Sequence, residues 1–148
     1  MSKIDDASFD TTVHVYDHCL CFAAQRAARA LARRFDEALA PLGLTSGQFS
    51  LLTSLNQRTP PSIGSIAALL VMDRTTLTAN LKPLERRGLV RINVDAADRR
   101  GRRLTLTAAG RRVLRSAMPT WERTHGEIDG RLAQTDAKAL RSGLRALA

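Results

Sequence analysis

The feature that most constrains the fold of this chain is a helix signal that passes directly into two strand signals within residues 73–107. Three leucines recur at positions i, i+4 and i+7, which places them on one side of a helix: Leu77, Leu81 and Leu84. Asp73 is a good N-cap for this helix, and Gly88 suits a left-handed C-terminal cap. Pro83 lies inside the predicted helix, where we expect a kink or a distorted last turn.

Two runs of alternating apolar and polar residues follow this helix. They predict two half-buried strands over residues 89–93 and 103–107. The segment between them, residues 94–102, is too rich in charge to belong to a core. The pattern therefore predicts a hairpin whose loop lies in solvent.

The flanking segments carry apolar residues at helical spacing. They predict a long helix over residues 13–40 and a second helix that begins with a capping box between Thr45 and Gln48. Further helices are expected from Ile63, after a cap at Thr107, and from Thr135. Residues 1–12 are polar and are expected to be flexible. The expected fold class is mainly α with a small β-hairpin (α+β): four helices, the hairpin, then two helices.

Positive charge is concentrated around the predicted hairpin. The chain of 148 residues has a net charge of +9, and the ten arginines and two acids from Arg86 to Arg115 give that segment +8. Such a surface attracts a polyanion through the release of condensed counterions. Aromatic residues, on which single strands usually stack, make up only 4% of the chain, so duplex DNA is the favoured polyanion. The alternative is an arginine-rich face that is simply solvated.

A short helix over residues 63–70, a tight turn at 71–73 and a polar-faced helix together predict a helix-turn-helix. The polar face of its second helix would enter the major groove of DNA and contact base edges or phosphates. Its candidate DNA-contacting residues are Arg74, Thr75, Thr76, Thr78, Asn80 and Lys82. The hairpin loop would enter the minor groove as an arginine-tipped wing. Its candidates are Asp98, Arg99, Arg100 and Arg102, with Asp98 expected to orient a guanidinium group.

The stretch TTLTANLKPLERRGLVRINVDAADRRGRRLTLTAAG resembles the winged helix of the MarR family of bacterial transcription regulators, and LGLTSGQFSLL resembles the helix that precedes it. The resemblance implies a single domain over residues 13–148. Residues 45–107 would form the winged-helix lobe, with the wing at 94–102, and residues 13–44 and 108–148 would form the helices of a homodimer. It further implies a repressor that binds a pseudo-palindromic operator and is released by a small molecule. Independently, leucines on a terminal helix favour a partner surface: Leu140, Leu144 and Leu147.

The signal to which such a regulator responds is less clearly marked in the sequence. The resemblance suggests a small aromatic or anionic effector, with Arg26, Arg29 and Phe49 as candidate contacts. Leu20 to Ala23 also resembles the reactive-cysteine segment of the branch that senses organic hydroperoxides, with Cys21 as the sensor. In the places of that branch's supporting tyrosines this chain has Gln25, Ser46 and Phe49.

Other classes of function find less support. A metal site is conceivable because His14 and His18 are four residues apart, but cysteines at 19 and 21 point to different helix faces, so we expect no metal and no cofactor. The sequence contains no glycine-rich phosphate loop or nucleophile elbow, and we expect no enzyme. A winged helix that binds proteins instead of DNA remains an alternative. No segment is apolar enough to span a membrane, and a cytoplasmic protein is expected.

Overall fold

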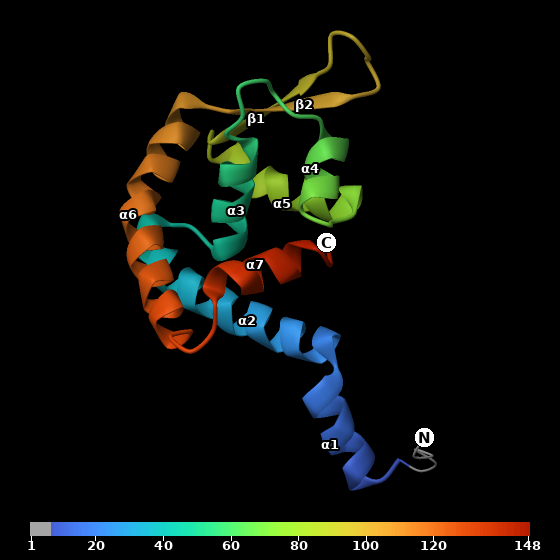
Figure 1. Ribbon diagram of the computed structural model, residues 1–148. Helices are drawn as coiled ribbons and strands as arrows, with labels where there is room; N and C mark the ends of the chain where they lie inside the picture. The colour runs from blue at the N-terminus through green and yellow to red at the C-terminus, as the bar shows by residue number, and fades with distance from the viewer. Residues whose placement is uncertain (1–6) are drawn as a thin grey trace.

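The computed structural model describes residues 7–148 and consists of helices with a single antiparallel hairpin (Figure 1). The winged-helix lobe contains α3 (Ser46–Leu55), α4 (Ile63–Leu69) and α5 (Arg74–Arg86), followed by β1 (Val90–Val94) and β2 (Arg102–Leu106). The other elements are α1 (Phe9–His18), α2 (Leu20–Leu39), the 3₁₀ turn η1 (Ala40–Leu42), α6 (Ala108–Arg131) and α7 (Ala137–Arg145). The expected fold class and order of elements are thus confirmed from α3 onward.

The expected single helix over residues 13–40 is wrong, because two helices occupy that segment and the first already begins at Phe9. Cys19 separates them in an extended conformation (φ −84°, ψ 104°), and its Sγ accepts a hydrogen bond from the backbone N–H of Phe22 at 3.3 Å. Cys19 therefore acts as the N-cap of α2. Residues 9–12, which were expected to be flexible, form the first turn of α1, while residues 1–6 lie outside the described part of the chain.

Local capping signals are matched closely by the structure. Thr45 and Gln48 form the predicted capping box at the start of α3. Asp73 caps α5, and Thr107 caps α6 through the backbone N–H of Gly110. Gly88 adopts the left-handed conformation (φ +70°) at the end of α5. The last helix begins at Ala137, two residues later than expected, because Asp136 is its N-cap.

Pro83 does not end α5, which continues to Arg86. A proline there cannot donate the backbone hydrogen bond to the carbonyl of Ala79. Both residues border an open hollow of about 200 Å³ between α5 and the start of α3. The carbonyl that Pro83 leaves free therefore lies beside space that water can enter, which reduces the cost of the missing bond.

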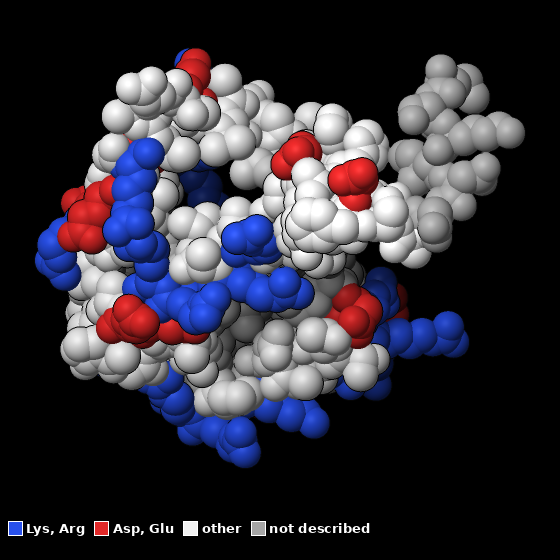
Figure 2. All heavy atoms as spheres, turned by 90° about the horizontal axis from the view of Figure 1, so that it is seen from below, with Lys and Arg blue, Asp and Glu red and all other residues white. Residues whose placement is uncertain are grey.

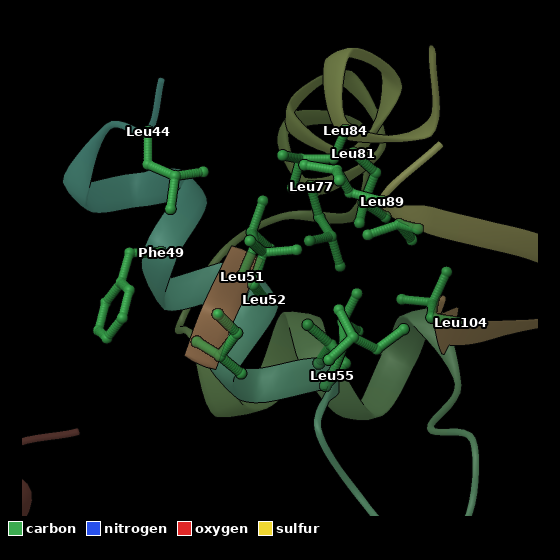
Figure 3. Close-up of a cluster of buried hydrophobic side chains, with 14 of the residues drawn as sticks. Leu44, Phe49, Leu51, Leu52, Leu55, Leu77, Leu81, Leu84, Leu89 and Leu104 are labelled. Carbon is green, nitrogen blue, oxygen red and sulfur yellow. The ribbon is translucent and has the colours of Figure 1, made fainter. Parts of the chain in front are cut away.

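Most of the core lies inside the winged-helix lobe (Figure 3), and it continues to Leu39 of α2 and to Leu114 and Ala117 of α6. The three predicted leucines of α5 are all 0% exposed and face leucines of α3, with Leu104 of β2 beside them. Val90 pairs with Leu106 and Val94 with Arg102, so the hairpin is in register along its whole length. Its strands begin and end within one residue of the prediction. The loop of the hairpin projects beyond the helices at the upper right of Figure 1.

The helices outside this lobe are poorly covered. Neither α1 nor α7 contains a buried residue, and α2 contains only Leu39. Several large apolar side chains of these helices are exposed: Phe9, Val15, Tyr16, Leu20, Leu140, Leu144 and Leu147. Among the helices of residues 7–148, none is long and apolar enough to cross a membrane.

Candidate nucleic-acid interface

The side of α5 opposite its buried leucines presents the predicted polar residues to solvent. Arg74, Thr75, Asn80 and Lys82 are exposed, and Thr78 is half-buried. Thr75 and Lys82 lie with Arg74, Thr78 and Ala79 around an open surface hollow. The helix therefore offers a continuous polar strip of the kind that can enter a groove of DNA.

Two of the predicted threonines are engaged in bonds within the helix. Thr76 donates its hydroxyl to Asp73 Oδ2 at 2.7 Å, and its backbone N–H donates to Asp73 Oδ1 at 2.8 Å. These two bonds lower the pKa of the Asp73 carboxyl. Thr78 donates its hydroxyl to the carbonyl of Arg74 at 2.8 Å. Thr76 thus belongs to the cap of α5, whereas the hydroxyl of Thr75 is exposed.

The wing loop is held by bonds within itself. Its backbone closes through the N–H of Asp95 to the carbonyl of Gly101 (3.1 Å) and the N–H of Gly101 to the carbonyl of Asp98 (2.8 Å). The Arg102 guanidinium donates to the carbonyls of Arg99 and Gly101. The loop is therefore a defined turn that carries three exposed arginines at its tip.

The expectation that Asp98 orients a guanidinium is not met, because Asp98 Oδ1 accepts the backbone N–H of Arg100 at 3.0 Å. Its role is to close the turn, as aspartate often does in loops. The acid that pairs with an arginine is Asp95, whose Oδ2 lies 2.8 Å from Nε of Arg103. The N–H of Ala97 and then Arg103 lower the pKa of Asp95.

Arg103 and Asp95 were missed as site residues from the sequence. Nη1 of Arg103 also donates to the carbonyl of Pro60 at 3.3 Å, and the N–H of Leu104 donates to the carbonyl of Pro61 at 2.9 Å. The base of the wing is therefore tied to the loop between α3 and α4. Asp95, the other acid of the loop, was the only signal in the sequence. The contact of Arg103 with Pro60, forty-three residues away along the chain, cannot be predicted from spacing.

The wing and α5 border one shared hollow of about 450 Å³. Arg74 and Thr78 line it from α5, while Asp98, Arg100 and Arg102 line it from the wing. The structure thus brings five of the ten predicted DNA-contacting residues together around one hollow. Asn80 lies farther along α5, where its Nδ2 contacts Met72 Sδ at 3.7 Å.

The effector candidates occupy different surroundings. Phe49 is only 8% exposed, belongs to the core, and points away from the α5 leucines (Figure 3). Arg26 lies over the ring of Phe22, with Cζ 5.5 Å from the ring centroid, and Arg29 is exposed on α2. Phe49 thus contributes to packing in this structure.

The cysteines and histidines lie around the junction of α1 and α2. Cys21 is exposed and its Sγ accepts from Nε2 of Gln25 at 3.3 Å. The rings of His14 and His18 stack with centroids 4.2 Å apart. Within residues 7–148, no group of three or more His, Cys, Asp or Glu side chains could hold a metal ion.

Charge on the face seen from below Figure 1 is mixed. Figure 2 shows basic side chains in a row across this face, with acidic side chains next to some of them and uncharged surface around. Because residues 86–115 carry +8 of the total of +9, the rest of the chain is nearly balanced. The mixed face agrees with that distribution.

Comparison with known proteins gives consistent matches. The sequence matches the MarR family over residues 44–101. The transcriptional regulator HosA of Escherichia coli O127:H6 is 37% identical over 92 residues, which span 61% of this chain and 67% of HosA. The Mycobacterium tuberculosis regulator MosR in complex with DNA is 38% identical, with a TM-score of 0.79 over 88% of this chain and 93% of that chain. The repressor CouR bound to a 23-mer DNA duplex is 30% identical, with a TM-score of 0.79 over 90% and 94%.

Proposed function

This chain belongs to the MarR family, and we propose that it is a transcription regulator that binds duplex DNA as a homodimer. The observation that carries the proposal is the hollow shared by α5 and the wing, which sets a polar helix face beside an arginine-tipped loop. A helix fits the major groove, and a thin basic loop fits the adjacent minor groove. MosR and CouR, which share this fold, are bound to DNA in their structures.

Each element has its own task in this proposal. Thr75, Thr78, Asn80 and Lys82 of α5 face the base edges and phosphates of the major groove, while Thr76 holds the N-cap of α5 in place. Arg99, Arg100 and Arg102 enter the minor groove, where a narrow A·T tract concentrates negative potential. Asp98 keeps the turn closed while these arginines bind.

The second copy of the chain covers the apolar residues that α1, α2 and α7 expose. Leu140 and Leu144 of α7 and Leu147 just after it are 41%, 49% and 68% exposed, and Leu20 of α2 is 70% exposed. A two-fold axis would set the two α5 helices about 34 Å apart, one turn of DNA. The operator is therefore a pseudo-palindrome.

The regulator acts as a repressor and catalyses no reaction. A small aromatic or anionic effector releases it from DNA by binding close to α2 and α3, where Arg26 and Arg29 supply positive charge and Phe49 supplies an aromatic ring. A panel of aromatic carboxylates, added to the protein–duplex complex, tests this part. Arg26→Ala with Arg29→Ala should keep DNA binding and lose the response.

DNA binding itself is tested with a duplex that the protein selects from a random-sequence pool. Replacement of Arg99, Arg100 and Arg102 by alanine should weaken binding, and should reduce the slope of log K against log salt by roughly 0.9 for each lost phosphate contact. Replacement of Arg112, Arg115 and Arg123 of α6 removes the same charge and is the matched control. Equal losses in both variants would exclude a specific role for the wing. A protein that selects no duplex would favour a protein-binding winged helix.

A thiol sensor is the second candidate, supported by the exposed side chain of Cys21. Attack of its thiolate on an organic hydroperoxide would give the sulfenic acid and the alcohol, with the electron pair of the O–O bond leaving on the alcohol oxygen. Organic hydroperoxide should then release the unaltered protein from its duplex and leave a Cys21→Ser variant bound. Release of both proteins would exclude Cys21 as the sensor.

A further inference from the structure

Gly64, in the first turn of α4, lies directly under the side chain of Arg74. A Cβ atom built on Gly64 would come within 2.8 Å of Nη2 and 3.5 Å of Cζ of Arg74. Any residue larger than glycine at position 64 would place its Cβ where the Arg74 guanidinium lies. The guanidinium of Arg74 therefore lies close to the backbone of α4 at Gly64.

Arg74 has no acidic partner in this position. None of the ion pairs among residues 7–148 includes it, and its side chain is exposed. A guanidinium carries five N–H donors in a fixed fork, which suits an anion with several oxygens. The position that Gly64 permits thus leaves these donors available.

The donors border the shared hollow between α4, α5 and the wing, which Arg100 and Arg102 also line. Of the two acids on the same wall, Asp95 is paired with Arg103 and Asp98 binds the backbone N–H of Arg100. Three arginines around one hollow therefore face two carboxylates that already have partners. The hollow of about 450 Å³ is therefore lined by more basic than acidic side chains.

A protein that places a helix in one groove and a wing in the next must straddle the sugar–phosphate backbone between them. The hollow lies between these two elements, at the place where that backbone would pass. We infer that Arg74 forms a seat for one backbone phosphate of DNA at the edge of the wing, next to Arg100 and Arg102, and that Gly64 is the positioning residue that lets Arg74 reach it. The inference rests on the proposed function and assigns Arg74 to a phosphate instead of a base edge.

The assignment separates affinity from sequence preference. Phosphate contacts fix the register of the protein on the duplex and carry no sequence information of their own, whereas base-edge contacts do. Loss of Arg74 should therefore weaken binding to all duplexes by a similar factor. The base preference should stay with the other exposed residues of α5.

The test compares Gly64→Ala, Arg74→Ala and the double variant with the unaltered protein on a selected duplex. The clashing atoms are the far end of a flexible side chain, so alanine at 64 should move Arg74 and leave the melting temperature unchanged. We expect a weakening of about tenfold or more for Arg74→Ala and a smaller one for Gly64→Ala. The double variant should bind no more weakly than Arg74→Ala alone. Gly126→Ala, where a Cβ meets no atom within 4 Å, is the matched control.

Replacement of single phosphates by neutral methylphosphonates identifies the contact. One position in each half-site should weaken the unaltered protein most, Gly64→Ala less and Arg74→Ala least. Additive losses in the double variant, or an altered preference at one base pair in Arg74→Ala, would overturn the inference while the unaltered protein still binds. Failure of the unaltered protein to select any duplex would overturn the proposed function as well.

Discussion

The helices α5 and α7 carry the same leucine spacing but differ completely in burial. Leu77, Leu81 and Leu84 of α5 are each 0% exposed, whereas Leu140 and Leu144 of α7, and Leu147 just after it, are 41%, 49% and 68% exposed. Spacing at i, i+4 and i+7 determines which side of a helix is apolar. What covers that side depends on the rest of the fold.

For α5 the cover comes from the same chain. Leucines of α3 and Leu104 of β2 face it across the core of the winged-helix lobe (Figure 3). For α7 the proposed cover is a second copy. The core of the lobe should therefore respond to mutation as a unit within one chain, and the terminal helices as half of an interface.

The largest expected effect is truncation inside the lobe. Leu81→Ala removes a side chain that is 0% exposed, so the free energy of unfolding should fall by about 2–5 kcal/mol. Urea denaturation followed by circular dichroism measures it. The loss should not depend on protein concentration, because the cavity lies within one chain. A loss below about 1 kcal/mol would mean that the core of the lobe collapses around the gap.

The second effect concerns the terminal helices. Leu144→Asp puts a charge on the apolar side of α7, so dimer association should weaken by about a hundredfold or more if a second copy covers this side. Sedimentation velocity at several protein concentrations measures it. The variant should keep the circular dichroism of a folded lobe, and its melting temperature should be lower and should depend less on protein concentration, because less of its stability comes from association. An unchanged dimer would show that α7 packs back onto its own chain.

Local chemistry explains what could be predicted from the sequence. Asp73, Thr45, Thr107 and Gly88 act on backbone groups within four residues, so the ends of α3, α5 and α6 were predicted from short patterns. The exposed side of α5 followed from its buried side. The candidate DNA-contacting residues of α5 and the wing were therefore selected without knowledge of the tertiary contacts.

Contacts between distant segments explain what was missed. Arg103 reaches the carbonyl of Pro60, and Gly64 makes room for Arg74, but no periodicity marks either pair. Cysteine is not among the residues that usually cap a helix, so nothing in the sequence indicated the break between α1 and α2 at Cys19. A helical pattern gives spacing and not direction, so the 8% exposure of Phe49, a candidate effector contact, could not be predicted.

A smaller effect is expected at the joint between the two regions. Asp36 of α2 accepts the backbone N–H of Ser46, at the start of α3, through Oδ1 at 2.6 Å. This bond lowers the pKa of Asp36 from its ordinary value of 3.8. A carboxyl whose pKa is lower in the folded chain than in the unfolded chain stabilises the fold at pH values above its unfolded pKa. This stabilisation is lost as the pH falls below 3.8 and through the pKa of the folded state.

Asp36→Asn should therefore lower stability at neutral pH and flatten its decline under acid, as followed by thermal melts over a pH series. The neighbouring Glu37→Gln neutralises an exposed acid of the same helix and serves as the control. If both variants show the acid response of the unaltered protein, the link between α2 and α3 contributes no pH-dependent stability.

The smallest effect is expected in the turn between α4 and α5. The same pair of backbone hydrogen bonds ends α5 and α4. At the end of α5, the N–H groups of Gly88 and Leu89 donate to the carbonyls of Glu85 and Leu84, and at the end of α4 those of Val71 and Met72 donate to the carbonyls of Ala68 and Ala67. The left-handed position is Gly88 (φ +70°) in one case and Val71 (φ +51°) in the other.

A left-handed conformation costs a residue with a Cβ roughly 1–2 kcal/mol, while the backbone entropy of glycine offsets about 0.5–1 kcal/mol. Val71→Gly should thus raise the free energy of unfolding by less than about 1 kcal/mol. The gain should be the same at every protein concentration in urea denaturation, because the turn belongs to the self-contained lobe. A loss of stability would instead show that the Val71 side chain, 70% exposed in one chain, is covered in the dimer.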